Sequence, residues 1–273
     1  MVGARFVQLV KLALMPDFDN NGASVHYELV GSGPPVLMIA GIASDGASWG
    51  PLTPLLAERH RLILIDNRGC GRTKVEGPLA IADMVDDAVA LLDRLDIREA
   101  NVVGHSLGGA IGLLIAARHP SRVRRLVTMT SGGISAKTRT LFEDLARVYA
   151  RVEPQDYFRL LYQWLFSESF FANPANVAAA ATGSVLYPFR QSPADFARQV
   201  EALKTVPAID REAIACPVLA LAAGRDLLGP PDDVAALHAG IADHRVEVIA
   251  DAAHSIHWEA TGAVAEKVLG FLG

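Results

Sequence analysis

Short apolar runs alternate with helical patterns along most of the chain. The runs at 36–40, 61–65 and 218–222 are apolar almost throughout, as is typical of strands that are buried on both faces of a parallel sheet. The stretch at 83–95 spaces its apolar residues as an amphipathic helix does, and 107–118 reads as a helix rich in small residues. This alternation predicts an α/β fold: a doubly wound, mostly parallel sheet with helices on both sides.

The alternation stops between residues 131 and 205, where helical patterns follow one another without a buried strand. We expect 131–205 to be a helical cap inserted into an α/β core that comprises residues 23–130 and 206–273. Residues 1–22 are expected to form an N-terminal extension outside the fold. Some aromatic residues of the cap should line a pocket, and the others should form its own core. They are Phe142, Tyr149, Tyr157, Phe158, Tyr162, Trp164, Phe166, Phe170, Phe171, Tyr187, Phe189 and Phe196.

Composition narrows the classes of partner. With 273 residues, 51% hydrophobic residues and a net charge of −5, the chain has no basic field to attract nucleic acid or an anionic membrane. Two scattered cysteines, Cys70 and Cys216, form neither a disulfide framework nor a zinc site, so a reducing cytoplasm is the expected location. A small neutral or weakly charged ligand fits best, and the sequence leaves open whether the chain forms a homo-oligomer.

Ser106 stands between an apolar run and a small-residue helix. Gly104 and Gly108 lie two residues to either side of the serine, which gives the pattern Gly-x-Ser-x-Gly. Only glycines there leave room for the sharp, strained turn that lifts a serine hydroxyl above a sheet edge. The pattern predicts a nucleophile elbow; the alternative is a tight turn whose serine merely caps the helix.

A serine nucleophile needs a base and a third group that orients the base. Asp226 follows one predicted strand and His254 follows the next, so both side chains should converge on Ser106 at the carboxyl ends of the strands. The order serine, aspartate, histidine is also the one that this elbow architecture uses. His257 is the competing histidine; a metal at the two histidines lacks a third ligand in any recognisable pattern. Asp251 lies too close in sequence to His254 to orient its ring.

Backbone N–H groups should complete the site as an oxyanion hole. Leu107 offers one at the helix start, and Ile42, in the loop after the first buried strand, offers the second. Gly41 gives that loop room to approach a substrate. No cofactor site is expected: the glycine-rich run 66–73 lacks the endings of phosphate-binding loops, and we interpret it as a structural turn in which Asp66 and Arg68 pair locally.

These motifs resemble those of capped α/β-hydrolases from about residue 24 to the C-terminus. The resemblance rests on the segments 104–109, 66–71, 224–226 and 252–259. Within that superfamily the chain is similar to small bacterial carboxylesterases and 3-oxoadipate enol-lactonases, whose loop after the first buried strand resembles 41–49. Most relatives have His-Gly where this chain has Ala40-Gly41, so a hydrogen bond that usually stiffens the oxyanion loop is expected to be missing.

We therefore expect a cofactor-free and metal-free serine hydrolase that cleaves small carboxylic esters or lactones. Ser106 attacks the carbonyl, His254 shuttles the proton, Asp226 orients His254, and the N–H groups of Ile42 and Leu107 hold the oxyanion. Enol-lactone hydrolysis, C–C bond hydrolysis and haloperoxidase-type perhydrolysis remain alternatives because they use the same triad. A ligand-binding receptor with this fold and little turnover is a rival of another class.

Overall fold

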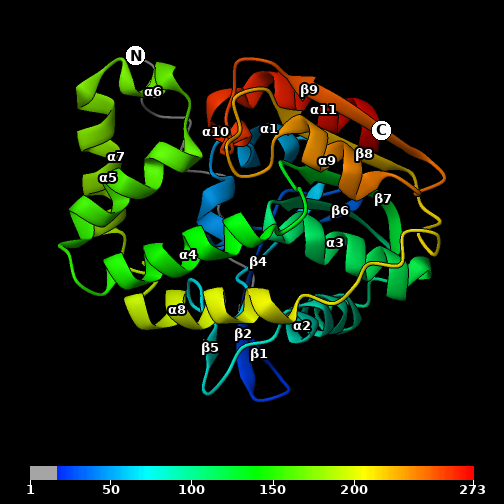
Figure 1. Ribbon diagram of the computed structural model, residues 1–273. Coiled ribbons are helices and arrows are strands. Elements are labelled where there is room, and N and C mark those ends of the chain that lie inside the picture. Colours follow the sequence, from blue (N-terminus) through cyan, green and yellow to red (C-terminus); the bar gives the residue numbers. More distant parts are fainter. Residues whose placement is uncertain (1–16) are drawn as a thin grey trace, which may run out of the picture.

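The computed structural model describes residues 17–273, in which nine strands form one sheet (Figure 1). The strand order is β1-β2-β4-β3-β6-β7-β8-β9, with β5 paired to β2. The strands are β1 Asp17–Asn20, β2 Ala23–Val30, β3 Pro35–Ile39, β4 Arg61–Ile65, β5 Lys74–Val75, β6 Ala100–His105, β7 Val123–Met129, β8 Val218–Ala223 and β9 His244–Ile249. From β4 to β9 every neighbouring pair is parallel, whereas β2 is antiparallel to its partners. The predicted doubly wound, mostly parallel sheet is confirmed.

Helices cover both faces of this sheet. Alternate residues of β3 belong to different cores: Leu37 and Ile39 pack with α2 and α3 on one face, and Val36 and Met38 pack with α1 and α11 on the other. Helix α9 packs against β8 and β9. The helices are α1 Thr53–Leu56, α2 Ile81–Arg94, α3 Leu107–Arg118, α4 Ala136–Tyr149, α5 Pro154–Leu165, α6 Glu168–Phe171, α7 Pro174–Leu186, α8 Pro193–Ala202, α9 Pro231–His238, α10 Ile256–Glu259 and α11 Thr261–Leu272, with 3-10 turns η1 Gly46–Trp49, η2 Pro120–Arg122 and η3 Leu203–Thr205.

The N-terminal part of the described chain differs from the expected extension 1–22. Residues 17–20 form β1 and pair antiparallel with β2. The turn between them consists of Asn21 and Gly22, both with positive φ (44° and 76°), which is the conformation of a two-residue β-hairpin. Phe18 is buried and packs edge-on against Tyr27 at 6.2 Å. An Asn-Gly pair between alternating residues is a hairpin signal, so β1 could have been found; residues 1–16 lie outside the described residues.

The segment between β7 and β8 carries helices α4 to α8, and within it the structure has no strand. We call it the helical insertion, residues 131–205. Helix α4 packs along α8, and α5 packs along α7; in Figure 1, α5, α6 and α7 stand together on the left of the view. The insertion shares a continuous apolar core with the α2 and α3 side of the sheet. In residues 17–273, no helix has both the length and the apolar character needed to cross a membrane.

Candidate active site

Ser106 lies at the junction of β6 and α3 in a backbone conformation that few residues adopt. Its φ and ψ angles are 52° and −116°, outside the regions that residues with a Cβ normally occupy. Two glycines make the turn sterically feasible. A Cβ at Gly104 would lie 2.3 Å from the carbonyl oxygen of Gly108, and one at Gly108 would lie 2.0 Å from the carbonyl oxygen of Ile39. The local sequence thus builds a strained elbow with Ser106 at its apex.

Asp226 and His254, which follow β8 and β9, are brought together by the fold. Nδ1 of His254 lies 2.9 Å from Oδ2 of Asp226, and both residues are buried. The other carboxylate oxygen accepts hydrogen bonds from the backbone N–H groups of Leu228 and Gly229. Burial alone raises the pKa of Asp226, but the His254 ring and the two backbone donors outweigh burial, so the pKa is lowered overall. The carboxylate is therefore held ionised and in one orientation.

The same hydrogen bond fixes the tautomer of His254. A carboxylate only accepts, so Nδ1 carries the proton and Nε2 is left as the basic nitrogen. The backbone carbonyl of His254 is also held, by Nε2 of His105 at 2.9 Å and Oγ1 of Thr130 at 3.0 Å. Ser106 and His254 line one cavity, although among residues 17–273 the Ser106 hydroxyl makes no hydrogen bond. The hydrogen bond between a nucleophile and its general base commonly forms or shortens only when substrate is bound.

The two residues predicted to supply the oxyanion donors line a common recess. Ile42 and Leu107, together with Ser106 and His254, surround a space of about 40 Å³, which is large enough for a water molecule. Leu107 begins α3, so its N–H has no acceptor within the helix. In the part of the chain that the structure describes, neither N–H has a hydrogen-bond acceptor. The recess is therefore lined by two residues whose N–H groups have no acceptor within the described part of the chain.

The loop after β3, which carries the predicted oxyanion donor Ile42 and is called the oxyanion loop below, is braced from the helical insertion. Gln199 of α8, fully buried, accepts a hydrogen bond from the N–H of Ala43 at 2.9 Å and donates to the carbonyl of Arg68 at 3.1 Å. Ala43 has a φ of 61°, a left-handed conformation that needs support in a residue with a Cβ. Asn67 donates to the carbonyl of Ala40 at 3.0 Å. These contacts stiffen the loop where the chain lacks the usual histidine before Gly41.

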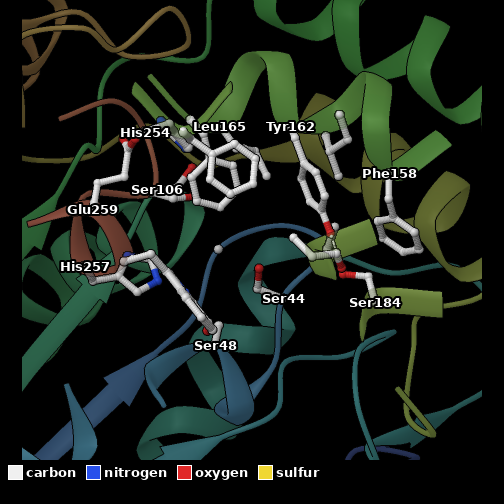
Figure 2. Close-up of a pocket in the computed structure, with 18 of the residues that line it drawn as sticks. Ser44, Ser48, Ser106, Phe158, Tyr162, Leu165, Ser184, His254, His257 and Glu259 are labelled. Carbon is white, nitrogen blue, oxygen red and sulfur yellow. Dashed lines mark hydrogen bonds between the residues drawn. The ribbon is translucent and has the colours of Figure 1, made fainter. Parts of the chain in front are cut away.

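His257 is not the partner of Asp226. Its ring packs against His105 and Trp49, with centroids 4.5 and 5.2 Å apart, and it lies in the wall of the cavity near Ser48 (Figure 2). Burial keeps the pKa of His257 well below the usual histidine value and lowers that of His105 to about 3, so both rings are neutral at pH 7. Among the described residues, no group of three or more His, Cys, Asp or Glu side chains is placed to hold a metal ion.

The predicted pairing of Asp66 with Arg68 is wrong. The carboxylate of Asp66 accepts hydrogen bonds from the backbone N–H groups of Gly46 and Arg72, both within 2.9 Å. Arg68 instead forms a two-pronged ion pair with Asp87 of α2, at 2.6 and 2.8 Å. Backbone donors from the same turn and from the loop after β3 satisfy the Asp66 carboxylate, and the Arg68 guanidinium pairs with the helix instead. Asp66 therefore ties the glycine-rich turn to the loop that follows β3.

A cavity of about 740 Å³ opens beside Ser106, between the helical insertion and the loops at the carboxyl ends of the strands (Figure 2). This volume is typical of a small-molecule site. No lysine or arginine is among the described residues that line it, and its one acidic residue is Glu259. The insertion contributes the aromatic lining residues Phe142, Phe158, Tyr162, Phe166 and Phe170. The space is therefore mostly apolar and has no cationic side chain in its wall.

Glu259 connects the insertion to the loop that carries His254. One carboxylate oxygen accepts from the N–H and the hydroxyl of Ser167, at 2.9 and 2.7 Å, and the other accepts from the N–H of Ala253 at 2.7 Å. A further backbone bond joins the N–H of Ser255 to the carbonyl of Leu165 at 2.8 Å. Both oxygens of Glu259 are thus occupied within the protein, so it holds structure rather than ligand.

Sequence reasoning missed three of these residues: Gln199, His105 and Glu259. Gln199 could have been found from the sequence pattern. It belongs to the same buried stripe of α8 as Phe196, three positions earlier, and Val200, the next residue. A polar residue on an apolar helix face indicates a buried hydrogen-bond partner. The other two left no comparable pattern.

A family model described as the alpha/beta hydrolase fold matches residues 34–261. The chain belongs to the α/β hydrolase fold family. Among its relatives is a protein of Azorhizobium caulinodans that carries the name of a carbamate hydrolase, RutD; it is 32% identical over 268 residues, which cover 95% of this chain and 98% of the relative. The family match confirms the resemblance to α/β-hydrolases that the sequence motifs indicated.

Two further comparisons give a partial sequence match and a match of fold. The 2-hydroxymuconate semialdehyde hydrolase of Pseudomonas sp. strain CF600 is 42% identical over 110 residues, 38% of this chain and 39% of that one. The solved enol-lactonase of Burkholderia xenovorans LB400 superposes with a TM-score of 0.82 at 24% identity, covering 94% of this chain and 99% of the other. The latter likeness concerns the fold alone.

Proposed function

We propose that this α/β hydrolase cleaves uncharged carboxylic esters through an acyl-enzyme, with Ser106, His254 and Asp226 as its triad and without a cofactor. The observation that carries the proposal is the oriented, buried Asp226–His254 pair beside a strained Ser106 that opens on a mostly apolar cavity without a cationic side chain. In this proposal residues 131–205 serve as a cap over a core made of residues 23–130 and 206–273.

The proposed reaction has two halves. Nε2 of His254 takes the proton as Ser106 Oγ attacks the ester carbonyl, and the N–H groups of Ile42 and Leu107 stabilise the oxyanion. The tetrahedral intermediate collapses, the C–O bond breaks, and the alcohol leaves with the proton from His254. A water molecule then attacks the acyl-enzyme, again giving its proton to His254, and the carboxylic acid departs as Ser106 Oγ recovers its proton.

The cavity supports an uncharged acyl chain. Each buried methylene stabilises binding by about 0.8 kcal/mol, so longer chains should react faster until the space is filled. A substrate carboxylate would lose its hydration without gaining a cation, because none lines the space beside Ser106. This argues against the enol-lactones and dienoates that derive from dicarboxylates.

The test compares two series of p-nitrophenyl esters on one enzyme preparation. One series ends in methyl, and the other has equal length and ends in carboxylate. We expect higher kcat/KM for every methyl-ended ester, with Ser106→Ala inactive on both and not labelled by a fluorophosphonate. A clear preference for the carboxylate-ended esters would contradict the proposal and favour a lactonase. Absence of labelling in the unmodified protein would favour a binding protein.

A carbamate is the second candidate substrate. The full-length similarity to the Azorhizobium protein named carbamate hydrolase favours it, and the same nucleophile and oxyanion donors can act on a carbamate carbonyl. The nitrogen of a carbamate donates electron density to that carbonyl and makes it less electrophilic. Aryl carbamates of matched size belong in the same assay, and a higher kcat/KM for them would replace the ester assignment.

A further inference from the structure

A second cavity, of about 290 Å³, adjoins the cavity beside Ser106. We call the cavity beside Ser106 the reaction cavity and the second one the outer groove. In the view of Figure 2, Ser44 lies between Ser106 and the more distant Phe158 and Ser184. Residues that line both spaces define the neck that joins them: Ala43 and Ser44 of the oxyanion loop, Phe158 of α5, Gly183 and Ser184 of α7, and Trp258 of α10.

The outer groove carries aromatic rings that are exposed at the surface. Trp258 and Phe189 both line it, and they are 52% and 39% exposed. The Arg72 guanidinium lies 4.7 Å from the centre of the Phe189 ring, which helps to hold this ring in place. Apolar side chains grouped at the surface beside a cavity are typical of a ligand-binding groove. A chain that leaves the reaction cavity through the neck therefore meets aromatic surface before it meets bulk water.

Helix α7 forms one wall of this whole path. Its lining residues recur at helical spacing and so share one face of the helix: Asn176, Ala180, Gly183, Ser184 and, directly after the helix, Tyr187. The first two line the reaction cavity, the next two line the neck, and Tyr187 lines the outer groove. This face therefore runs from the reaction cavity to the outer groove, and a side chain at position 183 would point into the neck.

Gly183 leaves the neck open. A Cβ at this position would meet no atom within 4 Å. Gly183 lies inside α7 without a positive φ, so the backbone does not require glycine there, and glycine makes a helix less stable than alanine does. Gly270 of α11 is equally free of contacts but lines neither cavity. Glycine at position 183 thus provides room in the neck, and a larger residue would remove it.

Little in the neck opposes an apolar chain. None of the residues that define it carries a charge. The Ser184 hydroxyl is bonded to that of Tyr162 at 2.6 Å, and within the described part of the chain Ser44 has the one neck hydroxyl without a hydrogen bond. Each methylene buried along the path strengthens binding by up to about fourfold. A chain that passes the neck therefore continues to gain affinity in the outer groove.

We propose that the outer groove binds the remote end of the substrate's acyl chain, which reaches it from Ser106 through the neck. Gly183 then determines the chain length that the enzyme accepts. This inference rests on the proposed function and narrows its substrate class to esters whose acyl chain is too long for the reaction cavity alone. The occupant follows from the continuity of the outer groove with the space in which the ester reacts.

The test measures kcat/KM for p-nitrophenyl esters of unbranched acids, from acetate upwards, below their micelle concentrations. In the unmodified protein kcat/KM should rise with each methylene until the path is filled. In Gly183→Leu the rise should end at a shorter chain. The loss should grow with chain length to about tenfold for the longest esters, chiefly through KM, because the gain of about two methylenes is removed. Gly183→Ala should give a smaller loss of the same kind.

Gly270→Leu is the matched control, because it adds the same side chain to an exposed helix glycine that lines neither cavity. Both leucine variants should raise the urea midpoint, since glycine weakens a helix, but only Gly183→Leu should change the chain-length profile. Phe189→Ala tests the outer groove itself, and its loss should be confined to esters long enough to reach Phe189.

Two results would overturn the inference. If Gly183→Leu and Gly270→Leu give the same chain-length profile, no chain passes the neck. If Gly183→Leu loses equally at every length, acetate included, position 183 affects entry or the fold rather than the end of the chain.

Failure of the proposed function would look different. If no ester is hydrolysed and no fluorophosphonate labels Ser106, the esterase assignment fails and the inference about the outer groove falls with it. If esters are hydrolysed through Ser106 while Gly183→Leu leaves the chain-length profile as it is, only the inference about the outer groove fails.

Discussion

Replacing Gln199 by leucine removes the brace between the helical insertion and the oxyanion loop with little change in side-chain volume. The amide oxygen no longer accepts from Ala43, and the amide nitrogen no longer donates to the carbonyl of Arg68. Both backbone groups then lose their hydrogen-bond partner in a part of the interior that water does not reach, because the side chain at position 199 is fully buried. The substitution therefore tests whether the oxyanion loop needs support from α8.

Two effects of different size are expected. Each buried backbone group left without a partner costs about 1–3 kcal/mol, so Gln199→Leu should lower the free energy of unfolding by about 2–5 kcal/mol after leucine burial is allowed for. Ala43, in a left-handed conformation, directly follows Ile42, whose N–H is a proposed oxyanion donor. Loss of one such donor lowers kcat about 10²- to 10³-fold, so a displaced donor should lower it by about ten- to a hundredfold.

The assay combines urea denaturation with steady-state hydrolysis of a methyl-ended ester. Oxyanion donors act on the transition state, so kcat should fall while KM changes little, and a trifluoromethyl ketone inhibitor should lose affinity in parallel. Thr128→Val is a control that breaks a buried hydrogen bond to His238 of α9, 2.8 Å long, in which the oxyanion loop takes no part. It should lower stability without lowering kcat. An unchanged kcat in Gln199→Leu despite lower stability would refute the reasoning.

The remaining predictions concern the reacting groups and their neighbours. Ser106→Ala should abolish ester hydrolysis and leave the urea midpoint nearly unchanged, because only one hydroxyl is lost from a turn. His254→Ala should match that loss of kcat while His257→Ala retains turnover; the reverse result would identify the other histidine as the base. Asp226→Asn should lower kcat by about 10³- to 10⁴-fold through the wrong ring tautomer, and wild-type kcat would exclude it from the triad. Burial lowers the pKa of His105 to about 3, so between pH 6.5 and 3 the His105 ring is protonated in the unfolded chain but not in the folded protein. The free energy of unfolding should therefore fall on acidification, and His105 alone should contribute about 1.4 kcal/mol per pH unit to this slope. His105→Gln keeps a donor for the His254 carbonyl and should flatten the slope by that amount; an unchanged slope would assign it to other groups.

Local rules account for the parts of the molecule that the sequence could predict. Residues 104–108 carry their own geometry, because the close approach of backbone at Gly104 and Gly108 is decided within a few residues and by the neighbouring strand. Asp226 and His254 could be placed near each other because each follows a parallel strand, and the carboxyl ends of such strands share one edge. The fold class followed from the same alternation of strands and helices.

Long-range contacts account for what the sequence could not give. Arg68 was expected to bind the nearest carboxylate along the chain, but Asp66 is satisfied by backbone donors and the guanidinium reaches Asp87. The bond from Ala43 to Gln199 spans 156 positions, and no local pattern names its partner.

The helical insertion touches the reacting region itself, and this limits how freely it can be exchanged. Gln199 accepts a hydrogen bond from Ala43, while Glu259 accepts from Ser167 with one oxygen and from Ala253, the residue before His254, with the other. A chimera that took residues 131–205 from another hydrolase would lose both supports together with the old substrate pocket. A graft that kept a glutamine at position 199 and a serine at position 167 would retain both supports. A graft without them should change specificity at the cost of a lower kcat. The insertion therefore cannot be replaced independently of the core, even though it is a continuous segment between β7 and β8.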